Sequence, residues 1–300
     1  MAGAVTAASV HFAGNLQSVI RGERRELLRL WESSSYNEVY SLSREALAAR
    51  PLDYFLLTMY GFSAYQLGVS QINSLSAAQY FNDCVLSLRK AMLLKNSAND
   101  GRLYYVLGKA YSYIGDSYTD LTVKYLEKAR SLSYSAADIP EYLGLAYAAI
   151  GDYRSSVAAF SQALQPRAAL DMTAEGVEEV QGQGPSGLLL LSIAQSYLAL
   201  GEYDSARAYL QHCIDISPDS RTVLSARLLL ADALRRADDN DGAKVQLLAI
   251  LEETGENAEA HYQLGELYAL QGESARARSE WRLALRADPA HSKARTRLSM

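Results

Sequence analysis

Small residues recur at one position of a helical pattern along the chain. They follow a large apolar residue, as in Leu107-Gly108 and Leu143-Gly144. The same position holds Leu27, Gly61, Gly108, Gly144, Ala194, Ala231 and Gly265. Seven residues later come residues that suit a helix end or a turn: Ser34, Gly68, Gly115, Gly151, Gly201, Asp238 and Gly272. The pattern predicts seven helices that each end at the same place.

A second helix is predicted after each of these ends. Apolar and small residues follow at steps of three and four, which places them on one helix face. The clearest sets are Ala206, Leu210 and Cys213, and Ala277, Trp281 and Ala284. Beyond the last member of several sets lies a residue that ends a helix: Pro51, Pro218, Pro289 or Gly255. Each stretch is therefore predicted to be a helix, a tight turn and a second helix.

This arrangement resembles the tetratricopeptide repeat (TPR) family over about residues 20–291. The spacings between successive small residues are 34, 47, 36, 50, 37 and 34, against a family length of about 34. The resemblance implies an all-α fold, a right-handed α-solenoid of stacked helix-turn-helix repeats. A single solenoid is expected, with units near 20–53, 54–100, 101–136, 137–170, 187–223, 224–257 and 258–291 and an insertion at 167–186.

Both ends of the solenoid need a cap, because each hairpin is stabilised by stacking on its neighbours. Residues 1–19 are expected to form an N-terminal segment or cap, and residues 292–300 a short solvating C-terminal tail. The predicted helix from Tyr54 to Leu67 is apolar on every side, so something must cover it. Either residues 1–19 or the extended helix beginning near Ser76 covers it from inside the molecule, or a partner chain or second copy does so.

Composition excludes several classes of function. The chain has 29 basic and 34 acidic residues and a net charge of −5, so it lacks the positive field that nucleic-acid binding needs. Two cysteines cannot make a disulfide framework, and four scattered histidines leave little material for a zinc site. The charge-free run from Tyr54 to Asn82 is broken by polar residues and glycines, so no membrane span is expected. A cytoplasmic location is expected, or a periplasmic one if a leader was removed.

No motif provides a basis for enzyme chemistry. Gly182–Gly187 satisfies G-x-G-x-x-G, but no predicted strand precedes it, so a flexible inserted loop is expected. Asp238–Gly242 imitates part of a calcium loop, but its spacing fails, and a turn with Asp241 as the cap of the next helix is expected. The acidic residues of the insertion suggest a solvated helix. We expect no enzyme activity, no cofactor and no metal.

Most aromatic and sulfur-containing residues that stand out have structural positions. Tyr111, Tyr147, Tyr197 and Tyr268 each lie three residues after the recurring small residue. They are expected to wedge between neighbouring helices, where truncation of Tyr147 to Ala would cost about 3–5 kcal/mol. Cys84 and Cys213 lie where other units have small contact residues, and both are expected to be buried and unreactive.

The resemblance also implies where a partner binds, because the first helices of successive TPR units line a concave channel. The basic and aromatic residues that it places there in the first three units are Arg21, Arg24, Trp31, Phe55, Thr58, Phe62, Tyr65, Arg102, Tyr105 and Lys109. The last unit contributes Glu259, Tyr262 and Glu266, so that end of the channel is acidic. The basic-plus-asparagine clamp by which some members hold a terminal carboxylate is missing.

Two functions are compatible with this pattern. The first is a non-enzymatic scaffold or adaptor that binds a peptide or helix of a partner protein, acidic or apolar in character, in the concave groove. The alternative is a solute-binding or transport-accessory protein with an enclosed apolar cavity around Leu145, Leu191 and Leu198. Self-association into a homo-oligomer is compatible with either.

Overall fold

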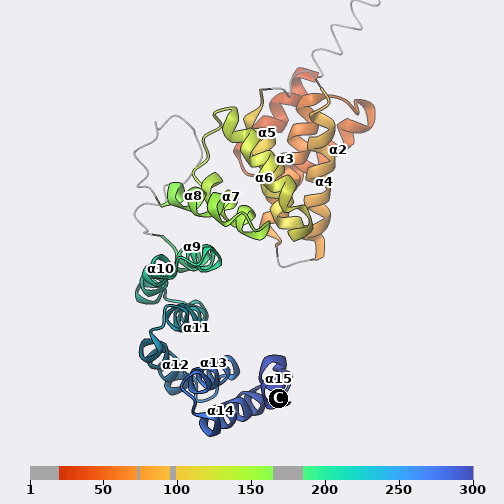
Figure 1. The fold of residues 1–300 in the computed structure, drawn as a ribbon. Helices are drawn as coiled ribbons and strands as arrows, with labels where there is room; N and C mark the ends of the chain where they lie inside the picture. The colour runs from red at the N-terminus through yellow and green to blue at the C-terminus, as the bar shows by residue number, and fades with distance from the viewer. Residues whose placement is uncertain (1–19, 73–74, 95–98, 165–184, 300) are drawn as a thin grey trace, which may run out of the picture. The chain divides into compact units, whose positions relative to one another are not determined.

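The computed structural model describes residues 20–72, 75–94, 99–164 and 185–299, and all regular structure in these ranges is helical (Figure 1). The predicted all-α helical repeat fold is confirmed. The chain divides into two compact units, Met1–Ala146 (unit 1) and Tyr147–Met300 (unit 2), and each is described by itself. That all repeats form one continuous solenoid stays a prediction.

Unit 1 is built of helices that pack in consecutive pairs. Its elements are a helix over residues 20–32, α2 (Tyr36–Ala49), α3 (Tyr54–Ser70), α4 (Leu75–Ala91), α5 (Gly101–Ile114), the 3-10 turn η2 (Asp116–Tyr118), α6 (Thr119–Ser131) and most of α7 (Ile139–Ala149). α3 packs on α4, and α5 packs on α6. These two pairs fall in the second and third predicted stretches.

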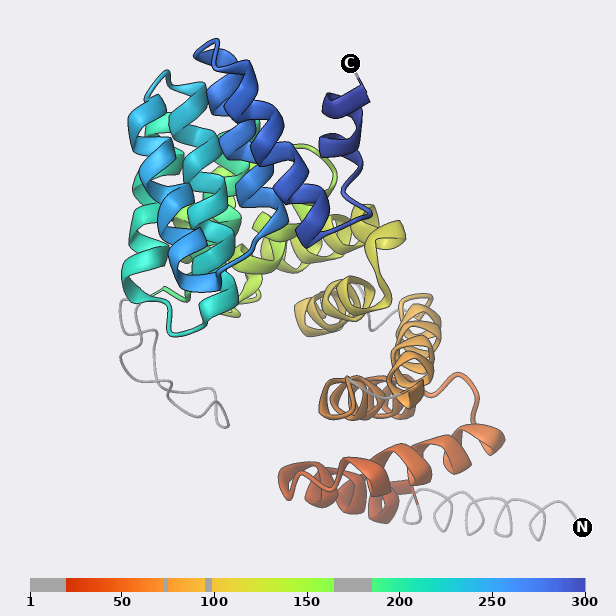
Figure 2. The ribbon, with the colours of Figure 1, turned by 90° about the horizontal axis from the view of Figure 1, so that it is seen from below.

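Unit 2 continues the same pattern after α7 (Figure 2). Its helices are α8 (Tyr153–Ala163), α9 (Gly187–Leu200), α10 (Tyr203–Ile216), α11 (Ser220–Arg236), α12 (Asn240–Thr254), α13 (Ala258–Leu270), α14 (Ser274–Ala287) and α15 (Ser292–Ser299). In the last three predicted stretches the two helices again pack on each other, α9 with α10, α11 with α12 and α13 with α14. Residues 182–184 of the motif at Gly182–Gly187 lie outside the described residues, as do the acidic residues of the insertion, and Gly187 begins α9.

The recurring small residue marks the closest approach of the two helices in a pair. A Cβ atom on Gly61 would lie 2.5 Å from the side chain of Leu88, and one on Gly108 would lie 2.6 Å from that of Leu126. A Cβ atom on Gly265 would lie 2.5 Å from Trp281. Since real Cβ atoms do not come so close to other heavy atoms, only glycine fits these three positions without rearrangement.

The predicted helix ends are correct with one exception. Backbone φ is positive at Gly151, Gly201 and Gly272, and also at Ser34 and Asp238, as expected for residues that stop a helix in the left-handed region. In the second pair the prediction was wrong: α3 continues through Gly68 to Ser70. Gly68 is buried against Phe81 of α4, so close packing, and not a turn, requires a glycine there.

The cap of α12 also differs from the prediction. The side chain of Asp239, and not that of Asp241, accepts the hydrogen bond from the backbone N–H of Gly242, at 2.9 Å. α12 begins at Asn240, so Asp241 lies inside the first turn. There its negative charge still interacts favourably with the N-terminal end of the helix dipole.

The apolar helix α3 is covered from inside the molecule. Most of its side chains are buried against α2, α4 and α5, and Trp31 packs on its Phe62. The covering helix α4 begins at Leu75, close to the predicted start near Ser76, which confirms that part of the intramolecular alternative. Residues 1–19 lie outside the described part of the chain.

The predicted C-terminal tail is wrong for residues 292–299, which form the helix α15. Ala294 of α15 is fully buried, and Leu298 packs in a cluster with Trp281 and Tyr262. A short, highly charged segment folds here because its cations pair with glutamates of α13, as described below. The periodicity of eight residues cannot predict such pairing, because the partners lie on another helix.

The tyrosines and cysteines are confirmed as structural to different degrees. Cys84 and Cys213 are fully buried, and Tyr111 is buried with its ring stacked 5.6 Å from that of Tyr125. Tyr147, Tyr197 and Tyr268 are only partly buried. The cost expected for truncating Tyr147 therefore applies better to Tyr111.

Candidate functional site

The ten predicted partner-binding residues come from the helix of residues 20–32, α3 and α5, and the structure brings most of them together. We call the surface that they share the first-helix face of unit 1. Its outer layer is cationic, with Arg21, Arg24 and Arg102 exposed. Beneath the cations lie partly buried aromatic rings, including those of Trp31 and Phe55.

Arg102 is held between two aromatic rings. Its guanidinium carbon lies 4.7 Å from the ring centroid of Phe62 and 5.3 Å from that of Trp31. The two rings are themselves 6.4 Å apart and tilted, so they form two sides of a seat for the cation. Within the described ranges no carboxylate lies within ion-pair distance of Arg102, and its N–H groups remain free to bind a ligand.

Arg24 has a similar seat but is partly neutralised. Its guanidinium carbon lies 5.1 Å from the ring centroid of Phe55, and one of its nitrogens lies 3.6 Å from a carboxylate oxygen of Asp53. Asp53 also caps α3 by accepting a hydrogen bond from the backbone N–H of Leu56. Since Asp53 is shared with Arg50 at 3.6 Å, this part of the face has less free positive charge than the part around Arg102.

Lys109 is engaged by the protein itself. Its Nζ donates to Asp138 Oδ2 at 2.6 Å and to the hydroxyl of Tyr105 at 3.2 Å, and lies 4.5 Å from the ring centroid of Tyr142. The Tyr105 hydroxyl donates to Asp138 as well, at 2.9 Å. Burial, and then the negative charge of Asp138, raises the pKa of Tyr105, so that hydroxyl stays protonated. The predicted ligand-binding role of Lys109 and Tyr105 therefore competes with a structural one.

Three predicted site residues lie in the core. Thr58 and Phe62 are each 7% exposed and Tyr65 is 8% exposed. Tyr65 packs against Phe81 and Tyr113, whose rings stack at 4.9 Å. A charged substitution at Phe62 or Tyr65 would therefore disrupt folding and could not test binding alone.

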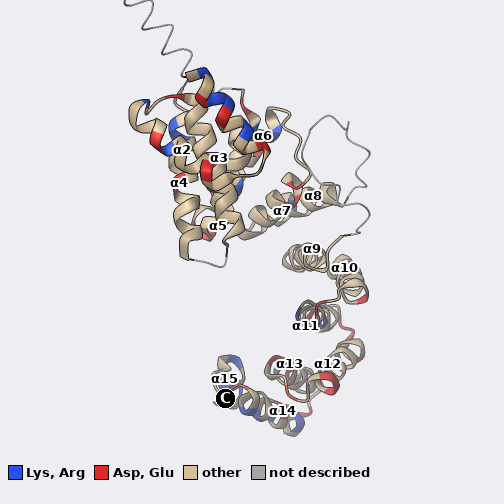
Figure 3. Cartoon of the chain, turned by 180° about the vertical axis from the view of Figure 1, so that it is seen from behind, with Lys and Arg blue, Asp and Glu red and all other residues tan. Residues whose placement is uncertain are grey.

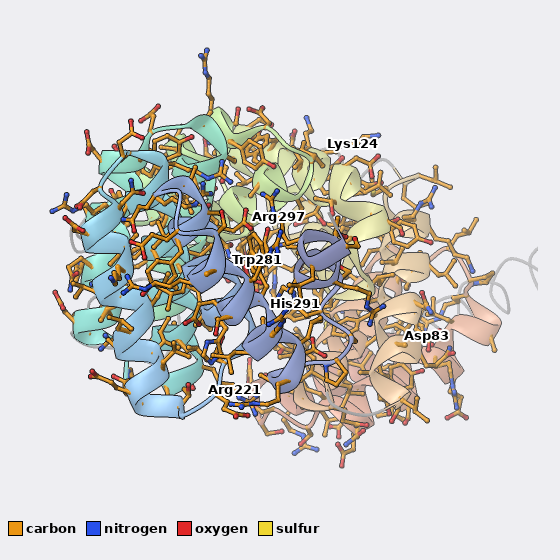
Figure 4. All side chains as sticks on the ribbon, turned by 60° about the horizontal axis from the view of Figure 1, so that its bottom comes forward. Asp83, Lys124, Arg221, Trp281, His291 and Arg297 are labelled. Carbon is orange, nitrogen blue, oxygen red and sulfur yellow. The ribbon has the colours of Figure 1, made fainter. Side chains whose placement is uncertain are left out.

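The acidic end of the predicted channel, in unit 2, is occupied by the chain's own α15 (Figure 4). Arg297 donates to both carboxylate oxygens of Glu266, with its Nε 2.8 Å from Oε1, and its guanidinium carbon lies 5.9 Å from the Trp281 ring centroid. His291 lies 3.1 Å from Glu259 and packs on the ring of Tyr262 at 5.2 Å. The expected acidic binding surface is therefore already paired with cations of the same chain.

A cleft that sequence reasoning missed lies in unit 2 between α10 and α12. Its volume is about 750 Å³, and its floor is formed by Leu230 and Leu234 of α11. One wall is a single face of α10: Asp204, Arg207, Ala208, Gln211, His212 and Asp215. The small residues Ala208 and Gly242 leave the cleft open. The three- and four-residue spacing of the wall residues on α10 could have pointed to one helix face, but not to the cleft beside it.

On the first-helix face of unit 1, Arg102 is seated on two aromatic rings and has no carboxylate within ion-pair distance among the described residues. Such an arrangement binds a carboxylate beside apolar groups, because the rings fix the guanidinium and exclude water around it. Among the described residues no helix is long and apolar enough to cross a membrane.

Comparison with known proteins places this chain among helical-repeat proteins. Residues 153–300 match the model of the tetratricopeptide repeat-like domain family. The anaphase-promoting complex subunit CDC16 of Saccharomyces cerevisiae is 32% identical over 85 residues, which are 27% of this chain and 10% of that protein. The matched segment thus spans about a tenth of the yeast protein's length.

Several solved structures share the fold. The C-terminal part of a TPR repeat-containing protein from Cytophaga hutchinsonii aligns over 92% of this chain and 100% of its own, with a TM-score of 0.60 and 14% identity. PilW, a type IV pilus biogenesis factor, aligns over 79% of this chain and 98% of its own, with a TM-score of 0.56 and 16% identity. YrrB, described as a TPR protein with an unusual peptide-binding site, aligns over 71% of this chain and 98% of its own, with a TM-score of 0.51 and 21% identity. The family match covers residues 153–300 and the solved structures share the fold of most of the chain, so the comparisons together support a tetratricopeptide repeat protein.

Proposed function

We propose that this protein is a non-enzymatic adaptor whose first-helix face in unit 1 binds a peptide or helical segment of a partner protein. TPR proteins are in general scaffolds for protein interactions, which supports the broad role. The segment would place an acidic group against Arg102 and apolar side chains against the rings of Trp31 and Phe55. Arginine and tryptophan are residue types enriched at the energetic centres of protein interfaces.

The observation that carries this proposal is the seat of Arg102. A guanidinium fixed between two rings has lost most of its conformational freedom before a ligand arrives, so less entropy is lost on binding. Its planar set of donors matches the two oxygens of a carboxylate. An arginine that stacks on rings but forms no ion pair contributes little to the stability of the fold. Its charge stays available to bind a carboxylate of a partner.

A protein segment fits better than an enclosed solute. The alternative of an apolar ligand cavity rests on Leu145, Leu191 and Leu198, and Leu145 is 45% exposed while the other two pack against the core of unit 2. The described cleft of about 750 Å³ is lined by different residues, some charged or polar and some apolar. YrrB, which shares the fold, is described by its peptide-binding site, and this supports a peptide as the ligand class.

The test is selection from a displayed library of short random peptides on the full-length protein. We expect the enriched peptides to carry Asp or Glu beside an apolar or aromatic residue. A synthetic copy of the best peptide should bind Arg102→Gln about tenfold or more weakly than wild type in a calorimetric titration, because one charge-assisted contact is lost.

The matched control is Arg25→Gln. Arg25 is exposed on the helix of residues 20–32, and the substitution removes the same charge from a position with no ring contact among the described residues. It should leave the affinity within about twofold of wild type. Failure to enrich any peptide, or equal affinities of wild type and Arg102→Gln, would refute the proposed site.

A further inference from the structure

The cleft between α10 and α12 has features that the proposed function does not use. Its α10 wall is exposed along its whole length, and Asp204 and Asp215 stand near the two ends of that wall. On the other side, Val245 of α12 is 63% exposed and the nearby Leu248 is 40% exposed. An exposed apolar lip beside an apolar floor indicates a surface that another chain covers.

The chemistry of the cleft favours a basic occupant with long aliphatic side chains. Asp204 has no hydrogen-bond or ion-pair partner in the described ranges, and Asp215 accepts only from Gln211 of its own helix. Asp239 adds a third carboxylate to the lining, against the single arginine Arg207. Arginine side chains could lay their methylene groups over Leu230 and Leu234 while their guanidinium groups reach the carboxylates.

The chain itself presents such a surface on α14. Arg278, Arg282 and Arg286 lie four residues apart and are all exposed, so they form one row along the helix. Like charges at this spacing destabilise a helix. Among the described residues only Arg286 of the three has an acidic partner, Glu256 at 2.7 Å. Folding alone therefore gives no reason for Arg278 and Arg282.

The charges of this part of the chain are strongly segregated (Figure 3). Residues 274–300 contain seven basic residues (Lys or Arg) and two acidic residues (Asp or Glu). Residues 147–273 contain eight basic and nineteen acidic residues. A surface of each sign on one molecule attracts the opposite surface of another copy, and such attraction acts over about 10 Å at about 0.1 M salt and about 30 Å at about 0.01 M salt.

We propose that the protein associates with copies of itself, the arginine row of α14 from one copy docking in the cleft between α10 and α12 of the next. The contact joins two different surfaces, so it is heterologous and builds a ring or an open chain. It is independent of the peptide site on unit 1. The same cleft could take a basic helix of another protein, and the experiment separates this outcome.

The test uses two full-length double variants and sedimentation velocity. The row variant carries Arg278→Gln and Arg282→Gln, and the cleft variant carries Asp204→Asn and Asp215→Asn; all four side chains are exposed, so both variants should fold as wild type does by circular dichroism. We expect wild type to form species larger than a monomer at low salt and to dissociate as salt is added. Each variant should associate about tenfold or more weakly.

Mixing the two variants is the decisive step. The row variant keeps an intact cleft and the cleft variant keeps an intact row, so one wild-type contact can form between them. The mixture should give a one-to-one dimer and nothing larger. A control with Lys124→Gln and Lys128→Gln on α6, an exposed pair with the same spacing, should associate as wild type does.

Three results would overturn the proposal. They are a wild-type protein that stays monomeric at low salt, a row variant that associates like wild type, and a mixture that stays monomeric. The first would leave a basic segment of another protein as the occupant of the cleft, which is a different inference.

Discussion

At the scale of single residues, the absence of one methyl group sets how closely the helices of a pair approach. Gly108 lies so close to Leu126 that a Cβ atom on Gly108 would lie 2.6 Å from the Cγ atom of Leu126 and 3.1 Å from the backbone nitrogen of Leu126. The backbone nitrogen cannot rotate away as a side chain can. Gly22, on the helix of residues 20–32, has no heavy atom within 4 Å of where its Cβ would lie.

The two glycines should respond in opposite directions to the same substitution. Gly108→Ala should lower the free energy of unfolding by about 1–3 kcal/mol, because the pair of α5 and α6 must open to admit a methyl group. Gly22→Ala should raise it by about 0.5–1 kcal/mol, because alanine favours a helix more than glycine does. Urea titrations followed by circular dichroism measure both changes in the free energy of unfolding. Changes of the same sign in the two variants would contradict the packing argument.

At the scale of the element, each helix depends on its cap and its immediate neighbours. The side chain of Asp219 caps α11, accepting from the backbone N–H of Thr222 at 2.9 Å and from its hydroxyl at 2.6 Å. These hydrogen bonds, the hydroxyl first, lower the pKa of Asp219 in the folded protein. Its contribution to stability is therefore present above the unfolded pKa of about 3.9 and is lost as the pH falls through the folded value.

Asp219→Asn should remove this part of the acid sensitivity. Asparagine also caps helices, so stability at neutral pH should change little. Between about pH 5 and pH 3 the free energy of unfolding of wild type should fall more steeply than that of the variant. Parallel pH profiles would mean that the cap does not depend on the charge of Asp219.

The helix α15 depends on its pairing with α13. Arg297→Ala removes the two-pronged contact with Glu266 and the contact with the Trp281 ring, at a cost of about 1 kcal/mol or less because the pair is half exposed. Amide exchange in α15 should become faster. Arg295→Ala, which removes an exposed arginine that bonds only to a backbone carbonyl, should leave the exchange rates nearly unchanged. Similar rates in both variants would contradict the role of Glu266.

The helices and their turns could be predicted from the sequence because most pairs repeat the same local requirement: a glycine or alanine where the helices touch and a turn residue seven positions later. The errors have long-range causes. Gly68 meets Phe81 and not a turn, and α15 forms because Arg297 reaches Glu266, thirty-one positions away. Arg102 could be predicted as a site residue from its charge. Its contacts with the rings of Trp31 and Phe62 could not, because they depend on how three helices pack.

At the scale of the whole molecule, stability in a repeat fold is nearly a sum over neighbours. Tyr111 is 3% exposed and stacks on Tyr125, so Tyr111→Ala should cost about 3–5 kcal/mol within unit 1. Hydrogen exchange should accelerate in α3 to α6 and stay near its wild-type rate in α11 to α14. Equal acceleration everywhere would show that the chain unfolds as one cooperative body.

The two tryptophans of the chain fall one in each unit, Trp31 and Trp281. Trp31 lies under Arg102, and Trp281 lies under Arg297. Replacing one of them with phenylalanine leaves a protein whose intrinsic fluorescence reports a single unit without any added dye. Emission of the first indole would then follow occupancy of the peptide site, and emission of the second would follow detachment of the terminal helix.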